Sequence, residues 1–266
     1  MEKSILFQQK KIFYNIAGKG PALILLHGFM ESKSIWESFT GKLILHFTVI
    51  SIDLPGHGDS DILAEIHTMS LMAHAVKAVL ANENISSCVV CGHSMGGYTA
   101  LQLASEEPDL FKGLVLFHSQ AAADSEEARE NRLHTIQIVK QNHKGFIKQF
   151  IPGLFDQKHL AKYTDAIREL QETASHMKPE AIIAALAGMR DRENHLELLS
   201  FTEMPVLFIA GKQDSRIPYN LVLTQAALPP YSEVLLLDNV GHMGFLEAPK
   251  ETCKTLKHFA LKCFED

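Results

Sequence analysis

One serine lies between two glycines in the segment Gly92-His93-Ser94-Met95-Gly96. The segment follows an apolar run, Cys88 to Cys91, that predicts a buried strand, and it precedes residues 98–104, which predict a helix. At such a sharp strand-to-helix turn a serine is held in a strained conformation with its hydroxyl exposed, and the glycines leave room for close approach. This pattern is typical of a nucleophile elbow, so Ser94 is a candidate covalent catalyst.

A serine nucleophile needs a base that takes its proton and an acid that orients that base. Asp214 and His242 each follow an apolar run that predicts a strand. Both therefore come at the carboxyl ends of strands, the edge where ligands bind in an open parallel sheet. We expect them to complete a catalytic triad with Ser94. Two alternatives stay open: Asp214 caps the helix that begins near Pro218, or Asp238 orients the base.

Short apolar runs along the chain alternate with amphipathic segments that predict helices. The expected strands are residues 4–7, 11–17, 22–26, 47–52, 88–91, 113–117, 205–210 and 233–237. This alternation predicts an α/β protein with a mostly parallel, doubly wound, eight-stranded sheet and helices on both faces. The first two strands are expected to form a hairpin.

The middle of the chain departs from this alternation, because residues 120–200 contain no strand-like run. Apolar side chains recur there at helical spacing, as in residues 146–151 and 182–189. We therefore expect a core made of residues 1–119 and 201–266, with residues 120–200 inserted as a helical cap. The charged segment 125–132 is expected to form a solvated helix face with close charge pairs.

Composition narrows the class of protein. The 266 residues carry a formal net charge of -6 and no cluster of basic residues, which argues against a nucleic-acid partner. No segment approaches the roughly 20 apolar residues of a membrane span, and the first 11 residues lack the apolar core of a secretory signal. We expect a cytoplasmic location as the default and no membrane association. The oligomeric state is left open.

The four cysteines give no sign of redox chemistry. Cys88 and Cys91 are spaced as in a CxxC motif, but they lie within a predicted strand, where residues three apart point to opposite faces. They are interpreted as small buried apolar residues. No histidine–cysteine spacing of a metal site is present in the sequence, so no metal or organic cofactor is expected.

With Ser94, Asp214 and His242 in this chain order, the sequence resembles the α/β-hydrolase superfamily, in its serine-nucleophile, helical-cap, esterase-like branch. The resemblance covers nearly all of the chain outside the helical middle section. It implies an α/β-hydrolase fold with a helical cap insertion. The serine at the nucleophile position argues against the branches that use an aspartate nucleophile.

Two further loops carry the resemblance. His27-Gly28-Phe29 resembles the oxyanion loop of the family, and Asp53-Leu54-Pro55-Gly56-His57-Gly58-Asp59-Ser60 resembles the turn after its fourth strand. The resemblance implies that the backbone N–H of Phe29 forms an oxyanion hole with that of Met95. Loss of one such donor typically lowers the rate roughly 100- to 1,000-fold. Asp53, His57 and Asp59 are expected to stabilise their turn.

We expect substrate contacts from residues near the nucleophile and from loops at the same sheet edge. These are His27, Gly28, Met30, His93, His118, Met243 and Phe245. Trp36 is expected in the core. If the cap arginines Arg129, Arg132, Arg190 and Arg192 converged on the pocket, they would favour a carboxylated substrate.

The predicted activity is that of a serine carboxylesterase (EC 3.1.1 type). It would cleave a small-molecule ester with a small to medium apolar acyl group through an acyl-enzyme. A C–C bond hydrolase, a pyruvate-eliminating lyase and a perhydrolase use the same triad and stay open. Tyr98 stands where the lyase branch usually has an arginine, which counts against that branch. A receptor-like ligand-binding module is the non-enzyme alternative.

Overall fold

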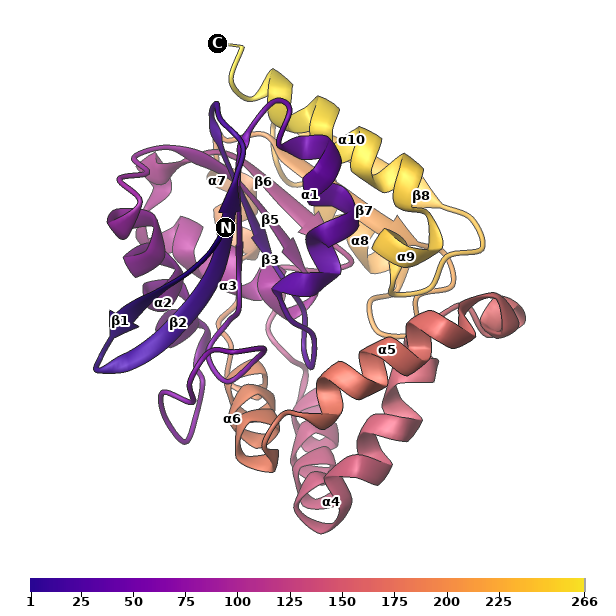
Figure 1. Cartoon of the computed structure of the whole chain (residues 1–266). Coiled ribbons are helices and arrows are strands. Elements are labelled where there is room, and N and C mark those ends of the chain that lie inside the picture. The colour runs from indigo at the N-terminus through magenta and orange to yellow at the C-terminus, as the bar shows by residue number, and fades with distance from the viewer. Residues whose placement is uncertain (266) are drawn as a thin grey trace.

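The computed structural model of the chain describes residues 1–265, and one eight-stranded sheet forms its centre (Figure 1). The strands are β1 Glu2–Phe7, β2 Lys10–Ala17, β3 Ala22–Leu26, β4 Thr48–Ile52, β5 Cys88–His93, β6 Phe111–Phe117, β7 Val206–Gly211 and β8 Ser232–Leu237. Their order across the sheet is β1-β2-β4-β3-β5-β6-β7-β8. Strand β2 pairs antiparallel with β1 and β4, and the remaining pairs are parallel. The predicted mostly parallel sheet is confirmed.

Helices cover both faces of the sheet. They are α1 Glu37–Leu43, α2 Met69–Asn82, α3 Met95–Glu106, α4 Glu126–Phe150, α5 Thr164–Ser175, α6 Pro179–Arg190, α7 Leu196–Phe201, α8 Tyr219–Ala226, α9 Gly244–Glu247 and α10 Pro249–Lys262. Short 3-10 helices span Lys33–Trp36, Pro108–Leu110, Ile151–Leu154 and Gln157–Tyr163. Figure 1 shows α1 and α10 on one side of the sheet and α2 and α3 on the other.

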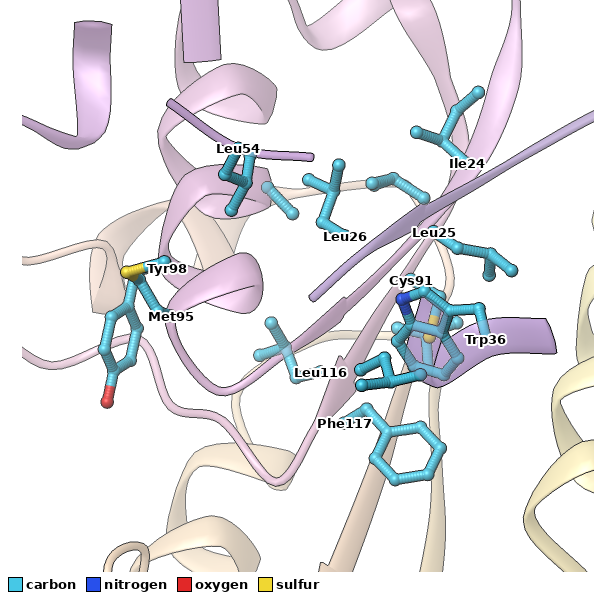
Figure 2. Close-up of a cluster of buried hydrophobic side chains, with 14 of the residues drawn as sticks. Ile24, Leu25, Leu26, Trp36, Leu54, Cys91, Met95, Tyr98, Leu116 and Phe117 are labelled. Carbon is cyan, nitrogen blue, oxygen red and sulfur yellow. The ribbon is translucent and has the colours of Figure 1, made fainter. Parts of the chain in front are cut away.

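Burial explains why the central strands have continuous apolar sequences. Every residue of β3 and of β5 is buried, because helices cover both faces there, whereas β1 at the edge alternates between exposed and half-buried positions. Figure 2 shows side chains of neighbouring strands, among them Leu26 and Leu116, in one cluster. Trp36 is fully buried in this core, with its ring 5.8 Å from that of Phe117.

The insertion between β6 and β7 is helical, as expected. Helices α4, α5 and α6 lie together at the bottom of Figure 1, beyond one end of the strands. Helix α4 packs along α6 and also contacts α5. The last helix of the insertion, α7, runs across the expected boundary at residue 200. That residues 120–200 act as a separate cap domain stays a prediction.

Two smaller features bear on function. Within residues 1–265, no helix combines the length and the apolar character needed to cross a bilayer. Cys88 and Cys91 are free and buried in β5, and burial raises the pKa of the Cys88 thiol to about 12. Such thiols are unreactive, which agrees with their interpretation as apolar core residues.

Candidate active site

Ser94 occupies the turn between β5 and α3 in a strained conformation, with φ 49° and ψ -113°. Its N–H donates to the carbonyl of Phe117 (2.9 Å), and its carbonyl accepts from the hydroxyl of Ser119 (2.8 Å). A Cβ on Gly92 would lie only 2.3 Å from the backbone of Gly96. The flanking glycines therefore permit the close turn, and the bonds to β6 and its following loop hold the serine in it.

Asp214, in the loop after β7, contacts the predicted base directly. Its Oδ2 accepts a hydrogen bond from Nδ1 of His242 at 2.8 Å. Its Oδ1 accepts from the N–H groups of Arg216 (2.7 Å) and Ile217 (3.0 Å), so Asp214 also caps the turn that leads into α8. Asp238 is exposed and pairs instead with Lys212 at 2.7 Å. Asp214 thus contacts His242 and also caps the turn, as both interpretations of it expected. Asp238 contacts Lys212 instead of His242.

The electrostatics of Asp214 fix the tautomer of His242. Burial alone would raise the pKa of the Asp214 carboxyl, but the facing His242 and His118 hold it well below its usual range. The ionised carboxylate keeps a proton on Nδ1 of His242 and leaves Nε2 to accept one. His242 and Ser94 line the same cavity. That Ser94, His242 and Asp214 act as nucleophile, base and orienting acid stays a prediction.

A second histidine shares the carboxylate of Asp214. His118, directly after β6, donates from Nδ1 to Oδ2 of Asp214 at 3.0 Å. Burial lowers the pKa of His118 to about 4, so the ring is neutral. His118 is not among the residues that line the cavity, and its ring is fully buried against Asp214 and Gly244. That it contacts substrate stays a prediction.

The predicted oxyanion donors lie on two sides of the nucleophile. Met95 is the first residue of α3, so its N–H has no partner within that helix. Within residues 1–265 the N–H of Phe29 has no hydrogen-bond acceptor, and Phe29 lines the cavity together with Ser94. The loop is fixed around them: Nε2 of His27 accepts from the N–H of Leu54 at 3.0 Å. That these two N–H groups form the hole stays a prediction.

Glu31 is a buried carboxylate beside the candidate site that the sequence analysis did not single out. Its Oε2 accepts from the N–H of Gly28 (2.5 Å) and from Nδ1 of His93 (2.9 Å), and its side chain is 2% exposed. Nε2 of His93 in turn contacts the carbonyl oxygen of His242 at 2.9 Å. A carboxylate four residues after His27 has no motif of its own. The only sequence signal is its closeness to the oxyanion loop.

A cavity of about 310 Å³ lies between the carboxyl ends of the strands and the inserted helices. Its walls are formed by Phe29, Glu31, His93, Ser94, Tyr98, Ala128, Asn131, Arg132, Thr135, Phe150, Leu154, Leu186, Met189, Ser215, Arg216, Ile217 and His242. Residues of α4 and α6 face the nucleophile across this space. The volume is at the small end of the range for small-molecule sites.

Of the seven expected substrate contacts, only His93 lines this cavity. His27, Gly28, Met30, His118, Met243 and Phe245 are not among its walls, and that they contact substrate stays a prediction. Met30 and Met243 are fully buried, and the ring of Phe245 packs 5.8 Å from Trp36. The side chains near the nucleophile in sequence thus support the site from the core, whereas the inserted helices supply much of the wall.

Helix α4 contributes four residues to the cavity wall. Ala128, Asn131, Arg132 and Thr135 line the cavity, at the spacing of one helix face. In the segment 125–132 most residues are exposed, as expected for a solvated face, and Arg132 is paired with Asp124. Ala128 and Arg132 are half-buried where they line the cavity.

The arginines at the cavity differ from those expected. Only Arg132 of the four cap arginines lines it, and Asp124 pairs with both Arg132 and Arg192. Arg216, from the loop after β7, also lines the cavity, with its guanidinium 4.4 Å above the ring of Phe150. No carboxylate within residues 1–265 forms an ion pair with Arg216. Arg216 therefore brings to the cavity wall a guanidinium that has no ion pair within residues 1–265, whereas Arg132 is paired with Asp124.

Three side chains could offer a metal ion donor atoms within 4.8 Å of one another: His118, Asp214 and His242. In both histidines, however, the nitrogen that faces Asp214 donates a hydrogen bond to its Oδ2. A metal ion at this position would have to displace both of these protons. The geometry is that of a hydrogen-bonded cluster around one carboxylate.

Comparison with known proteins agrees with this geometry. A family model described as "alpha/beta hydrolase fold" matches residues 21–249. The chain is 27% identical over 254 residues to a pimeloyl-[acyl-carrier protein] methyl ester esterase of Xanthomonas campestris, covering 92% of this chain and 97% of that protein. It is also 27% identical to the protein of that name from Xylella fastidiosa, covering 93% and 98%.

Among solved structures, the chain is similar to a thermophilic esterase from Thermogutta terrifontis, described as malate bound. The TM-score is 0.91 at 28% sequence identity, covering 96% of this chain and 94% of that one. An enol-lactonase from Burkholderia xenovorans is similar in fold, with a TM-score of 0.89 at 19% identity over 97% and 99% of the two chains.

Proposed function

Because the chain belongs to the alpha/beta hydrolase fold family, we propose that it is a serine esterase that cleaves a small carboxylic ester through an acyl-enzyme. The observation that carries the proposal is the 2.8 Å hydrogen bond from His242 to Asp214, beside a cavity that Ser94 also lines. The esterases among its relatives support the same class of reaction.

In the first half-reaction, Nε2 of His242 takes the hydroxyl proton of Ser94 while the serine oxygen attacks the ester carbonyl. The carbonyl oxygen gains negative charge and accepts hydrogen bonds from the N–H groups of Phe29 and Met95. The partial positive charge at the start of α3 also favours this oxyanion. His242 then gives its proton to the leaving alcohol, and the acyl group stays on Ser94.

In the second half-reaction, His242 takes a proton from water, which attacks the acyl carbonyl through a second tetrahedral intermediate. Ser94 leaves as the hydroxyl after His242 returns the proton. Asp214 remains ionised throughout, because its pKa lies well below the usual range, and it stabilises the imidazolium that forms twice per cycle.

The cavity suggests the size and character of the substrate. About 310 Å³ accommodates a small to medium group, and apolar side chains such as Phe29, Leu186 and Met189 contribute to its walls. The methyl ester esterases among the relatives make short alcohols reasonable leaving groups. We propose an ester of a short alcohol whose acyl chain lies along these apolar walls.

The test combines an active-site label with turnover. A fluorophosphonate should label the wild-type protein once, and p-nitrophenyl acetate should give a burst of nitrophenol. Ser94→Ala should abolish both, with only residual hydrolysis, whereas Ser200→Ala, a helix serine bonded to the carbonyl of Leu196, should retain both. Turnover by folded Ser94→Ala protein would overturn the mechanism. A folded wild-type protein without ester turnover would favour the receptor-like module.

A second candidate, a carboxylated substrate, is favoured by Arg216 and Arg132 on the far wall. The position after Gly97 is Tyr98, whose ring lies 4.2 Å beneath the guanidinium of Arg192, so the lyase branch gains no support there. An ester with a distal carboxylate fits both observations.

The prediction for this candidate is a change in specificity. Arg216→Gln should raise KM about tenfold for a monomethyl dicarboxylate and leave KM for the equally long neutral methyl ester within about twofold, because one charge-assisted contact is removed. Steady-state kinetics on the matched pair of esters measures this difference. Equal changes for both esters would contradict a role in binding the carboxylate.

A further inference from the structure

We propose that Glu31 and His93 form a buried ion pair that positions the oxyanion loop and the His242 loop on either side of Ser94. The pair neutralises a carboxylate that would otherwise oppose the oxyanion. The inference extends the esterase mechanism proposed above and rests on it for its kinetic consequences.

The contacts form one continuous chain across the site. The N–H of Gly28, next to the oxyanion donor Phe29, donates to Oε2 of Glu31 at 2.5 Å. Nδ1 of His93 lies 2.9 Å from the same oxygen, and Nε2 of His93 lies 2.9 Å from the carbonyl oxygen of His242. His93 directly precedes the nucleophile in the sequence. The chain therefore links the oxyanion loop, the elbow and the catalytic histidine.

The acceptors around His93 fix its charge. One ring nitrogen faces an oxygen of Glu31 and the other faces a carbonyl oxygen. Because the pKa of Glu31 is held below its usual range, its carboxylate is ionised and, like the carbonyl, can only accept. Both nitrogens must carry hydrogens, which makes His93 an imidazolium. Burial would lower the pKa of His93, but the adjacent Glu31 carboxylate outweighs it and raises that pKa. The same partnership holds the pKa of Glu31 below its usual range despite burial.

Other titratable groups face His93 from several elements. They are His27 and Glu31 after β3, His118 after β6, Asp214 after β7 and His242 after β8. The rings of His93 and His242 lie with their centroids 5.0 Å apart. Asp214 already serves His242 and His118, so Glu31 is the carboxylate that compensates His93.

The pair matters for catalysis because Glu31 lines the cavity beside the oxyanion loop. An isolated anion there would repel the negative charge that develops on the carbonyl oxygen. With His93 charged, the pair has no net charge, and Glu31 can fix Gly28 without opposing the reaction. His93 and Glu31 act through the loops they hold and are positioning residues.

A double-mutant cycle separates this role from simple space filling. His93→Gln leaves a buried carboxylate without its cation, so kcat/KM on p-nitrophenyl acetate at pH 8 should fall on the order of 100-fold. Glu31→Gln should lower kcat/KM about tenfold. The double variant should recover about tenfold relative to His93→Gln, because the unpaired charge is gone. His195→Gln, at a buried histidine bonded to Gln102, is the matched control and should stay near wild type.

The pH profile supplies a second readout. In His93→Gln the pKa of Glu31 rises, since burial is no longer balanced by the imidazolium. Activity should then decline as pH increases through that pKa and the carboxylate ionises. The wild type, Glu31→Gln and the double variant should lack this decline. Equal losses in the single and double variants, without the alkaline decline, would overturn the proposal.

Nuclear magnetic resonance of 15N-histidine protein tests the pair without turnover. The wild-type spectrum at pH 8 should show His93 with both ring nitrogens protonated, and Glu31→Gln should convert it to a neutral ring. A neutral His93 in the wild type would refute the ion pair. Failure of the esterase proposal shows separately, as a wild-type protein with an imidazolium at His93 but neither ester turnover nor fluorophosphonate labelling.

Discussion

Two buried acid–histidine pairs flank Ser94, and they differ in what the second ring nitrogen of the histidine contacts. Asp214 and His242 are joined at 2.8 Å, and Glu31 and His93 at 2.9 Å. Nε2 of His93 is bonded to the carbonyl of His242, whereas His242 lines the cavity and has no bond from Nε2 within residues 1–265. In the proposed mechanism, the same chemical pair provides a base in one place and a rigid connection in the other.

This difference shows that an acid beside a histidine does not make a catalytic base. A base needs a nitrogen that can accept a proton where the substrate binds. Asp214 places the proton of His242 on the buried side of the ring and leaves the other side reactive. His93 has an oxygen acceptor on both sides, so it holds both protons and exchanges neither.

The largest expected effect comes from removing the base. His242→Gln should lower kcat/KM on p-nitrophenyl acetate by about 10⁴-fold or more, because no other group near Ser94 takes its proton. His93→Gln should lower kcat/KM only about 100-fold, since the base is retained. Both are measured on protein whose fold is checked by circular dichroism. Comparable losses in the two variants would show that the pairs have the same role.

Removing the charge of the acid tests the other half of the catalytic pair. Asp214→Asn should lower kcat by about 10⁴-fold, because the amide no longer fixes the required tautomer of His242. Its Oδ1 can still accept from the N–H groups of Arg216 and Ile217, so the loop is retained. Asp238→Asn removes an exposed carboxylate from the loop after β8 and should change kcat less than twofold. A large loss in Asp238→Asn would reassign the acid.

A smaller effect concerns how the free energy of unfolding depends on pH, which has opposite signs for His118 and His93. His118, the second histidine that contacts Asp214, has its pKa lowered to about 4. Between that pH and 6.5, the unfolded chain therefore binds a proton at this histidine and the folded protein does not. Its contribution to stability is present above pH 6.5 and is lost as pH falls towards 4. From pH 7 to pH 5, His118 should reduce the free energy of unfolding by about 2 kcal/mol.

Urea unfolding at pH 7 and pH 5 measures this change. In His118→Gln the acid-induced loss should shrink by that amount, whatever the variant's stability at pH 7. His93 has the opposite sign, because its pKa is raised: its contribution is present below pH 6.5 and is lost as pH rises through the folded pKa. An unchanged acid slope in His118→Gln would show that His118 is not held neutral.

Local pattern was sufficient for the fold and for the order of the candidate triad. Continuous apolar runs predicted β3 and β5, since strands buried on both faces require apolar residues at every position. The glycines around Ser94 predicted its strained turn because only small residues permit that backbone approach. Asp214 and His242 were found because they follow strands whose ends share one edge.

The substrate contacts could not be found in this way. Met30, Met243 and Phe245 lie close to site residues in the sequence, yet their side chains point into the core. Asn131 and Thr135 belong to a charged helix, and only the packing of α4 against α6 shows that this face lines the cavity. Closeness along the chain says little about which side of a loop a residue faces.

The sequence by itself determined the sheet, the helical insertion, and the candidate nucleophile with its expected base and acid. These follow from short-range rules of burial, backbone sterics and strand direction. Only the tertiary structure decided that His93 contacts Glu31, 62 positions away, and that His118 contacts Asp214, 96 positions away. Such contacts depend on the relative placement of several loops. The identity of one buried partner decides the protonation of the other, and no local pattern encodes it.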